Sequence, residues 1–494
     1  MKKRIFSIMA ASNKKKAGII VFCILLITTF GAGFVFTMSD NGDQAPPYEF
    51  PGPIPPADPY MPIAIEIGNI DIRANPVLTI ALSGNQYQFI HSAAQIFERM
   101  HEGVTINIER HGEFRMSYDA WLRTALDEGN APDIFAINPG IEFYLAKSPM
   151  LVNLYELMDN DPNFHMEDYF TEVFKALEVN GRLPYIPVCF LIDFIGLSDN
   201  APIEARRMFL AAETMSYAGM VNIYNSIPDR YGLRMTTTGL SFMNIIYQGC
   251  FIDYRRRVSL FNEPEFIDFL YNVREMRQNE SYFPETVIRS SRDIPKYYMF
   301  RRYLYPGSIY RVLLPASVRD DFWGEFGFSE FRPYADAHGN INLSLLMEPS
   351  LAINAYSDNI GLAWEFMKFL LSEELFEILF TVSGRDGSFI PTLNARAFVN
   401  RNLNAQAMEV FFTRLIVNEM GVELTDEIKY EIADAVFEFE RLADMPMAHR
   451  WVWPPHDFGV LMNEILTDFE KGWLEPAQTA DMLHRAALEA FEER

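Results

Sequence analysis

The sequence predicts an α/β fold divided between two lobes. The chain has 494 residues, which is more than one compact hydrophobic core usually organises. Between residues 77 and 137, three short apolar runs rich in strand-forming residues alternate with two segments of helical periodicity. Apolar residues make up 49% of the chain and charged residues 22%, a composition typical of folded globular proteins.

The first five predicted elements follow one another with short connections. Residues 77–83 (VLTIALS) predict a strand, and the residues after it predict a helix that ends at Gly103. The buried face of this helix consists of Phe89, Ile90, Ala93, Ile96, Phe97 and Met100. A second strand over 104–108, a second helix over about 118–128 ending at Gly129, and a third strand over 132–137 complete the series. This order predicts a parallel sheet, whose ligands bind beyond the carboxyl ends of the strands.

The second half of the chain contains further regular segments. Residues 350–354 predict a strand, and Asp358 or Asn359 caps the helix that follows. This helix buries Leu362, Ala363, Phe366, Phe369 and Leu370. Near the C-terminus, a helix that ends at Gly472 buries Phe458, Leu461, Met462, Ile465 and Phe469, and a last helix begins near Pro476. Residues 195–345 are rich in aromatic residues, and their pattern defines no strand order.

The first 75 residues predict an exported protein. Six basic residues lie within the first sixteen, and Ala17–Met38 follows as 22 residues without a charge. At about 1.5 Å per residue this segment is long enough to cross a bilayer, and the preceding bases keep the N-terminus in the cytoplasm. Segment 1–38 is therefore a membrane anchor or a cleaved signal segment; a lipoprotein signal is excluded because Val21 and Phe22 precede Cys23. Residues 39–75, with eight prolines between 46 and 62, predict a disordered linker.

Charge excludes one class of partner. The whole chain carries a formal charge of −24, and without the six N-terminal bases the rest has 36 basic against 66 acidic residues, a net charge of −30. A body this acidic repels phosphate backbones, so we expect no binding to nucleic acid.

Cysteine and histidine patterns argue against metal and catalytic sites. Besides Cys23 the chain has Cys189 and Cys250, which form either one disulfide or two buried thiols. The eight histidines show no metal-ligand spacing, and neither a nucleophile elbow nor a phosphate-binding glycine loop occurs. We therefore expect no metal, no cofactor and no catalytic residues, although a pair of glycosidase carboxylates has no sequence signature that would exclude it.

The order of several segments resembles the extracellular, periplasmic-type solute-binding proteins of bacterial ABC transporters, family 1 or sugar-binding type. The matching segments are 77–100, 129–138 (GNAPDIFAIN), 151–161 (LVNLYELMDND), 180–190 (NGRLPYIPVCF), 259–273, 350–374 and 387–397. The resemblance implies a two-lobed, periplasmic-binding-protein-like (type II) fold with a hinge and an interlobe cleft. Lobe one would hold 76–188 plus 349–383, and lobe two 189–348 plus 384–494. Two or three crossing segments would join the lobes, and they would close on a ligand.

Candidate ligand-binding residues follow from the strand ends and from the tryptophans. Asn85 and Gln86 follow the first strand, and Asn138 and Glu142 follow the third, where each recognises hydroxyl groups or merely caps a loop or helix. Trp323, Trp451 and Trp453 are candidates for stacking on sugar rings, with burial as the alternative. We assign Trp121 and Trp364 to core packing, because both lie on predicted helix faces.

The resemblance implies an extracellular substrate-binding component of an ABC importer. Its partners would be a carbohydrate, the permease subunits and, through the N-terminal segment, the cell membrane; we expect a monomer. Two alternatives stay open: a sensor that presents the ligand to a membrane receptor, and an extracellular glycan-processing enzyme.

Overall fold

The fold is described from a computed structural model of the chain. It describes residues 76–83, 87–111, 115–138, 149–192, 194–198, 201–216, 251–253, 257–278, 298–303, 328–335, 339–344, 350–382, 397–449 and 456–492, with a few isolated residues between these ranges. The predicted membrane segment Ala17–Met38 and the proline-rich linker lie outside the described residues. In the part that is described, no helix has both the length and the apolar character to cross a membrane.

The first sheet has five strands in the order β2-β1-β3-β13-β4. These are β1 (Val77–Leu82), β2 (Thr105–Arg110), β3 (Ile134–Ala136), β4 (Ile186–Pro187) and β13 (Ser350–Ile353). Strand β1 lies between β2 and β3 and runs parallel to both, whereas β13 is antiparallel to β3 and β4. The predicted parallel sheet is confirmed, and the predicted strand 350–354 joins it as an antiparallel member.

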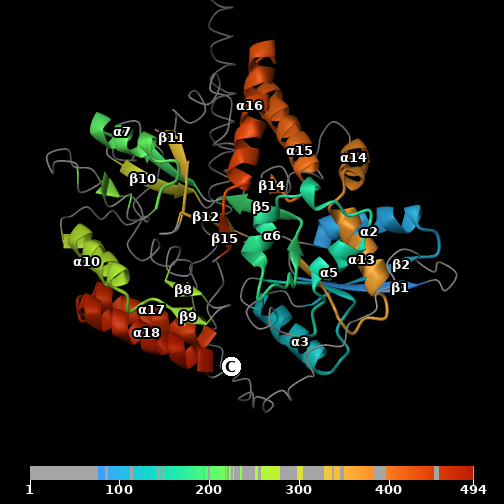
Figure 1. The fold of residues 1–494 in the computed structure, drawn as a ribbon, viewed down its shortest axis with the longest axis horizontal. Coiled ribbons are helices and arrows are strands. Elements are labelled where there is room, and N and C mark those ends of the chain that lie inside the picture. The colour runs from blue at the N-terminus through green and yellow to red at the C-terminus, as the bar shows by residue number, and fades with distance from the viewer. Residues whose placement is uncertain are drawn as a thin grey trace, which may run out of the picture. The chain divides into compact units, whose positions relative to one another are not determined.

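Helices cover both faces of this sheet: α2 and α13 lie on one side of β1 and β2, and α3 lies on the other (Figure 1). The helices of this part are α2 (Tyr87–Met100), α3 (Arg115–Asp127), α5 (Leu154–Asn160), α6 (Thr171–Leu177), α13 (Ile360–Leu370) and α14 (Glu373–Val382). The predicted face of α2 is buried except at Phe89, which is partly buried, and at Met100, the last residue, which is 41% exposed. Gly103 and Gly129 follow α2 and α3 with φ of 93° and 71°, in the left-handed region that ends helices.

One aspartate fastens the amino ends of the strands. Asp133 precedes β3, and its Oδ2 accepts hydrogen bonds from the backbone nitrogen and the hydroxyl of Thr79 in β1, both at 2.7 Å. Its Oδ1 accepts from Ser357 Oγ at 2.5 Å in the loop before α13. Asn359 stands at the N-cap position of α13 but makes no capping bond; its amide donates to the Val77 carbonyl instead. Asp133 thus ties three segments together at this edge.

The remaining strands form three smaller sheets. One has the order β14-β5-β12-β15, another the order β11-β6-β10-β7, and β8 pairs with β9. The strands are β5 (Cys189–Ile192), β6 (Phe194–Ser198), β7 (Arg234–Met235), β8 (Ile252–Asp253), β9 (Val258–Ser259), β10 (Tyr298–Tyr303), β11 (Phe328–Pro333), β12 (Ile341–Ser344), β14 (Ala397–Phe398) and β15 (Met447–His449). Cys189 is buried in β5, and Cys250 lies outside the described residues.

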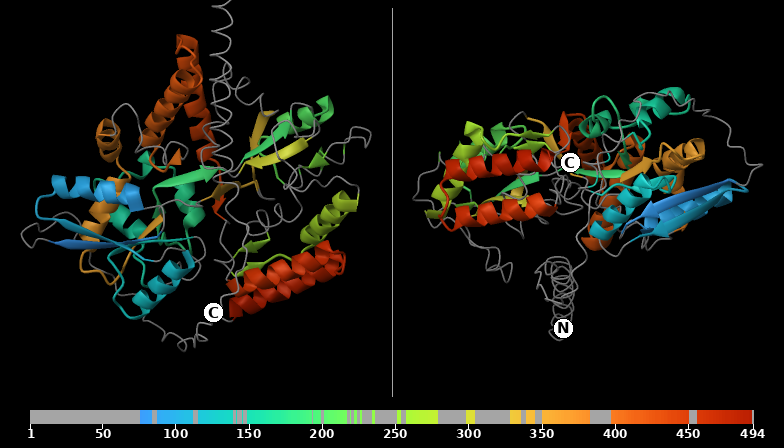
Figure 2. Two further views of the ribbon diagram at one scale, coloured as in Figure 1. Left: turned by 180° about the vertical axis from the view of Figure 1, so that it is seen from behind. Right: turned by 90° about the horizontal axis from the view of Figure 1, so that it is seen from below.

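Further helices accompany these strands: α7 (Ile203–Ala211), α10 (Pro264–Gln278), α15 (Arg401–Arg414), α16 (Asp426–Ala443), α17 (His456–Glu470) and α18 (Pro476–Glu492), with a 3-10 turn at Met166–Asp168 and a π-helical turn at Leu415–Glu419. Helices α17 and α18 lie side by side in both views of Figure 2. The predicted face of α17 is buried except at Leu461, which is 39% exposed.

Two separate clusters of buried hydrophobic side chains occur among the described residues. The first core draws on residues from Leu78 to Phe194, on Phe331, and on residues from Ile341 to Met447. The second core draws on residues from Ile195 to Val273, on Tyr334, and on residues from Phe458 to Phe491. The described part of the chain changes core near residue 194, on either side of Phe331, between 334 and 341, and between 447 and 458.

Helices α15 and α16 contribute to the first core, although the predicted lobe boundaries assign them to lobe two. Leu403, Met408, Ile432 and Phe439 are buried there. Arg401, at the start of α15, stacks its guanidinium 4.5 Å from the centre of the Phe170 ring of the same core. The boundaries of the lobes stay a prediction.

Candidate functional site

The carboxyl ends of β1 and β3 meet at one edge of the first sheet. The register pairs Ile80 with Ile134 and Ala81 with Phe135, so Ser83 and Asn138 emerge next to each other one or two residues beyond the strands. Ser83 Oγ donates a hydrogen bond to Asn138 Oδ1 at 2.8 Å, and both residues are buried. We define the carboxyl-edge site as these two residues together with Tyr118, Asp119 and Trp121 of α3 and His111 after β2.

Asn138 links the strands to helix α3. Its Nδ2 donates to Asp119 Oδ1 at 2.9 Å, while its backbone carbonyl accepts from the Ile141 nitrogen at 3.3 Å. The hydrogen bonds therefore run from Ser83 through Asn138 to the half-buried carboxylate of Asp119. This series of hydrogen bonds orients the Asp119 carboxylate at the edge where ligands of parallel sheets bind. A carboxylate is a strong acceptor for hydroxyl groups.

Tyr118 holds the two strand ends together. Its hydroxyl lies 3.1 Å from the Ala81 carbonyl oxygen and 3.0 Å from that of Ala136, and donates toward both. The side chain is completely buried. Burial, with a further contribution from the Asp119 charge, raises the pKa of Tyr118 far above its ordinary value, so the hydroxyl stays protonated and keeps donating.

A pair of stacked rings lies beside these polar groups. The imidazole of His111 is parallel to the indole of Trp121, with ring centres 3.4 Å apart and an interplanar angle of 9°. The His111 backbone nitrogen donates to the Leu82 carbonyl at 3.3 Å, which places the stack at the end of β1. His111 Nε2 lies 2.7 Å from Glu109 Oε2, and the imidazole side chain is 29% exposed. The stack gives the site a flat aromatic component next to a carboxylate.

Of the predicted site residues, Asn138 is the one that the structure describes. It is 2% exposed, and the structure assigns part of its amide to internal hydrogen bonds with Ser83 and Asp119. The other predicted residues, Asn85, Gln86, Glu142, Trp323, Trp451 and Trp453, lie outside the described residues. Their roles stay predictions.

Sequence reasoning missed the contribution of α3. Trp364 is wholly buried, as predicted, but Trp121 is only half-buried and stacks on His111. Tyr118 and Asp119 belong to no recognised motif. The one signal for them in the sequence is their place in the first turns of a helix that connects two strands of a parallel sheet. Among the described residues, no group of three or more His, Cys, Asp or Glu side chains is arranged to hold a metal ion.

Comparisons with known proteins bear on the fold. No protein-family model and no curated protein matches the sequence. Solved structures do match. The sugar-binding protein MalE from Xanthomonas citri is 14% identical with a TM-score of 0.55, and the match covers 85% of this chain and 98% of that one.

Two further structures match over similar lengths. An extracellular solute-binding protein family 1 from Alicyclobacillus acidocaldarius is 16% identical with a TM-score of 0.51, covering 84% of this chain and 98% of that one. A periplasmic oligogalacturonide binding protein from Yersinia enterocolitica is 14% identical with a TM-score of 0.52, covering 85% and 99%. These neighbours are binding proteins rather than enzymes, and they confirm the predicted fold: the chain has the two-lobed α/β fold of periplasmic solute-binding proteins.

Proposed function

We propose that the chain binds a carbohydrate between its two lobes and delivers it to the permease of an ABC importer. The proposal starts from its solute-binding-protein fold. The observation that carries the proposal is the carboxyl-edge site, where the Ser83–Asn138–Asp119 chain of hydrogen bonds lies beside the His111–Trp121 stack. Carboxylate and amide groups bind sugar hydroxyls, and a flat ring packs against the C–H face of a sugar. MalE is a sugar-binding protein and the Yersinia protein binds oligogalacturonide, so the same fold serves carbohydrates elsewhere.

The charge of the chain favours a neutral sugar. Asp119 and Glu109 bring carboxylates to the site, and the residues after the N-terminal bases carry a net charge of −30. Such a field repels an anionic oligosaccharide such as a galacturonide and leaves neutral hydroxyl donors unaffected. We therefore expect neutral oligosaccharides as ligands.

We also propose that the lobes are displayed outside the cell and that segment 17–38 tethers them to the membrane as an uncleaved anchor. Ala17–Met38 carries no charge over 22 residues and follows six bases. Mass spectrometry of the mature N-terminus distinguishes an uncleaved anchor from a cleaved signal segment. An intact Met1 supports the anchor, and a new terminus after residue 30 contradicts it.

The direct test of ligand binding is calorimetry with neutral and acidic oligosaccharides, supported by thermal unfolding. A ligand at about a hundred times its Kd stabilises the folded state by about 2.7 kcal/mol. Asp119→Asn preserves an acceptor for Asn138 but removes the charge, and we expect it to weaken binding at least about tenfold, since hydrogen bonds to charged groups contribute about 1.5–3 kcal/mol.

Asp434→Asn is the matched control, because Asp434 is an exposed carboxylate on α16. We expect it to leave affinity unchanged. Binding of no neutral sugar, or equal affinity in the Asp119 and Asp434 variants, would contradict the proposed site. Uptake of the bound sugar by cells that express the chain with its permease separates transport from sensing.

A further inference from the structure

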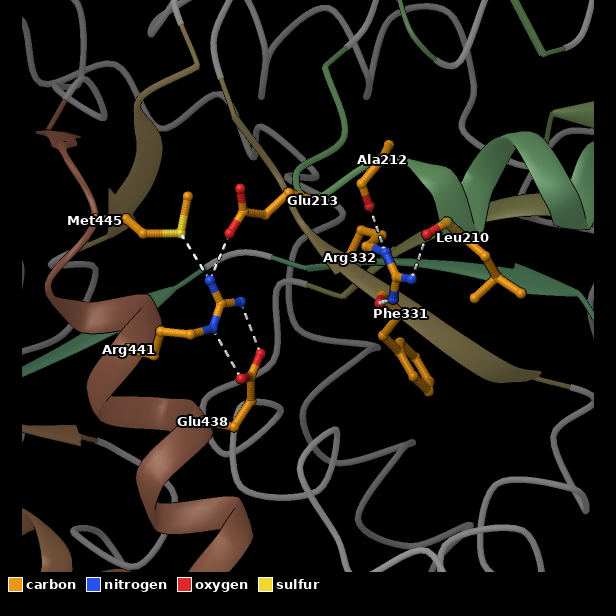
Figure 3. Close-up of polar contacts among 8 residues, drawn as sticks. All are labelled: Leu210, Ala212, Glu213, Phe331, Arg332, Glu438, Arg441 and Met445. Atoms are coloured by element: carbon orange, nitrogen blue, oxygen red, sulfur yellow. Dashed lines mark hydrogen bonds and ion pairs between the residues drawn. The ribbon is translucent and has the colours of Figure 1, made fainter.

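Arg441, near the end of α16, shares its guanidinium between two carboxylates (Figure 3). Its Nε and Nη2 donate to the two carboxylate oxygens of Glu438, each at 2.9 Å. Its Nη1 donates to Glu213 Oε1 at 2.5 Å. Glu438 lies three residues earlier on the same helix, so it fixes the plane of the guanidinium and directs Nη1 toward Glu213.

The two partners of this ion pair belong to different cores. Leu442 and Ala443, next to Arg441, are buried in the first core. Phe209 and Met215, on either side of Glu213, are buried in the second core. The ion pair therefore connects the two cores, between residues 228 positions apart in the sequence.

The backbone around Glu213 is fastened to strand β11. Arg332 of β11 donates from Nε to the Ala212 carbonyl at 2.6 Å (Figure 3). On the other side of Glu213, the Met215 nitrogen donates to the Pro333 carbonyl at 2.8 Å. Phe209 and Met215 anchor this segment in the second core, whereas Phe331 of β11 is buried in the first core. Movement of the second core relative to α16 should therefore change the separation of Glu213 from Arg441.

The ion pair lies close to two of the passages between the cores. Met215 forms an isolated β-bridge with Tyr334, and the chain crosses to the first core between Tyr334 and Ile341. Arg441 is six residues before Met447, after which the chain crosses back to the second core. A contact beside the connecting segments is placed to restrain their bending.

We infer that the Arg441–Glu213 ion pair is an ionic strut that holds the two cores in the arrangement of this structure and opens when they rearrange. The side chains of Arg441 and Glu213 are 39% and 62% exposed, so water and salt reach the pair. An exposed pair contributes too little to hold the fold together, yet enough to change the populations of two conformations a few-fold. Its effect on ligand affinity rests on the proposed function; the strut itself does not.

Single-molecule fluorescence energy transfer on the full chain in lipid nanodiscs tests the strut without any ligand. Labels at positions 204 on α7 and 374 on α14 are exposed and report on the second and first core respectively. We expect Glu213→Gln and Arg441→Met each to raise the population of the rearranged state about threefold at low salt. The double variant should match the single variants, because one interaction is removed in all three.

Two comparisons complete the experiment. Lys429→Met breaks an ion pair with Asp426 inside α16 and should leave the distribution unchanged. About 0.5 M salt should shift the unmodified protein toward the variants and leave the variants where they are. Distributions that coincide for all proteins at low salt, or effects of the two substitutions that add, would overturn the strut. Because no sugar is present, a failure here says nothing against sugar binding.

Discussion

Lys368 Nζ on α13 lies 2.5 Å from Asp161 Oδ2, which follows α5, and these side chains are 16% and 1% exposed. The same Oδ2 accepts a hydrogen bond from Trp364 Nε1 at 2.8 Å, and Asp161 Oδ1 accepts from the Asn163 nitrogen at 2.9 Å. A carboxylate withdrawn from water is costly unless its oxygens are paired. These contacts offset the cost of burying the Asp161 carboxylate, and they fix the loop after α5 to α13, the helix that covers the first sheet.

Removing one partner of this pair should destabilise the first core. Breaking a buried ion pair usually costs about 3–5 kcal/mol. We expect Asp161→Asn to lower the free energy of unfolding by less, about 2–3 kcal/mol, because Lys368 keeps its contact with Glu365. Urea denaturation followed by circular dichroism measures the change. Lys429→Met, at an exposed pair on α16, should shift the midpoint by no measurable amount. Equal effects of the two variants would contradict a structural role for Asp161.

The pH dependence of stability should differ between Asp161→Asn and the unmodified protein. Burial alone would raise the pKa of Asp161, but the hydrogen bonds from Lys368, Asn163 and Trp364 lower it below its ordinary value. A depressed pKa adds stability that is complete above the unfolded value of about 3.9 and is lost as pH falls below it.

The partner residue sets the upper limit of this window. Burial by itself would lower the pKa of Lys368. The hydrogen bonds and charges of Asp161 and Glu365 have the larger effect, so the pKa is raised. The stability from a raised pKa is present below the unfolded value of about 10.4 and lost as pH rises above it. The difference in unfolding free energy between the two proteins should therefore be constant from about pH 5 to 9 and shrink on both sides. A difference that grows below pH 4 would contradict this.

Most of the first sheet could be predicted because β1, β3 and β13 are largely buried on both faces. Such strands appear in the sequence as short apolar runs, and the predicted 77–83 and 350–354 agree with β1 and β13 within a residue or two. The middle of the chain could not be predicted, because its sheet pairs segments that are far apart. Phe300 pairs with Leu197, and no turn signal specifies a partner a hundred residues away. The amphipathic helix α16 shows the same limit, because periodicity defines an apolar face without indicating which core that face covers.

The candidate site was predictable in its location but not in its composition. The rule for parallel sheets predicts the edge after β1 and β3, and Asn138 lies there. Asp119 and Tyr118 lie in the first turns of α3, and they reach the site because α3 packs beside the ends of β1 and β3. That packing is a tertiary relationship, so no local pattern in the sequence reveals it.

Tyr118→Phe should loosen the carboxyl edge without removing any apolar surface. The substitution deletes the donor shared by the Ala81 and Ala136 carbonyls, which are buried. We expect the free energy of unfolding to fall by about 0.5–1.5 kcal/mol, the typical contribution of one hydrogen bond. Chemical denaturation gives the magnitude, and hydrogen exchange should show faster exchange at the ends of β1 and β3. The exposed Tyr430→Phe is the control, and an equally small effect of both changes would contradict the bridging role.

The two tryptophans of the first core should separate sugar binding from packing. Trp121 is half-buried and stacks on His111 at the candidate site, whereas Trp364 is fully buried and donates to Asp161. We expect Trp121→Leu to raise the Kd for a neutral oligosaccharide about tenfold, because the loss of one aromatic contact is worth about 0.5–1.5 kcal/mol beyond its buried area.

Trp364→Phe should behave in the opposite way. It keeps an aromatic side chain, smaller than the indole, but removes the hydrogen bond to a charged acceptor. We therefore expect it to lower the free energy of unfolding by about 2 kcal/mol and to leave the Kd unchanged. Calorimetry gives the Kd of each variant, and urea denaturation gives its free energy of unfolding. Together they test whether Trp121 binds sugar and Trp364 packs the core. If the Trp364 variant loses affinity while the Trp121 variant keeps it, the stacked rings are part of the packing and the ligand binds elsewhere.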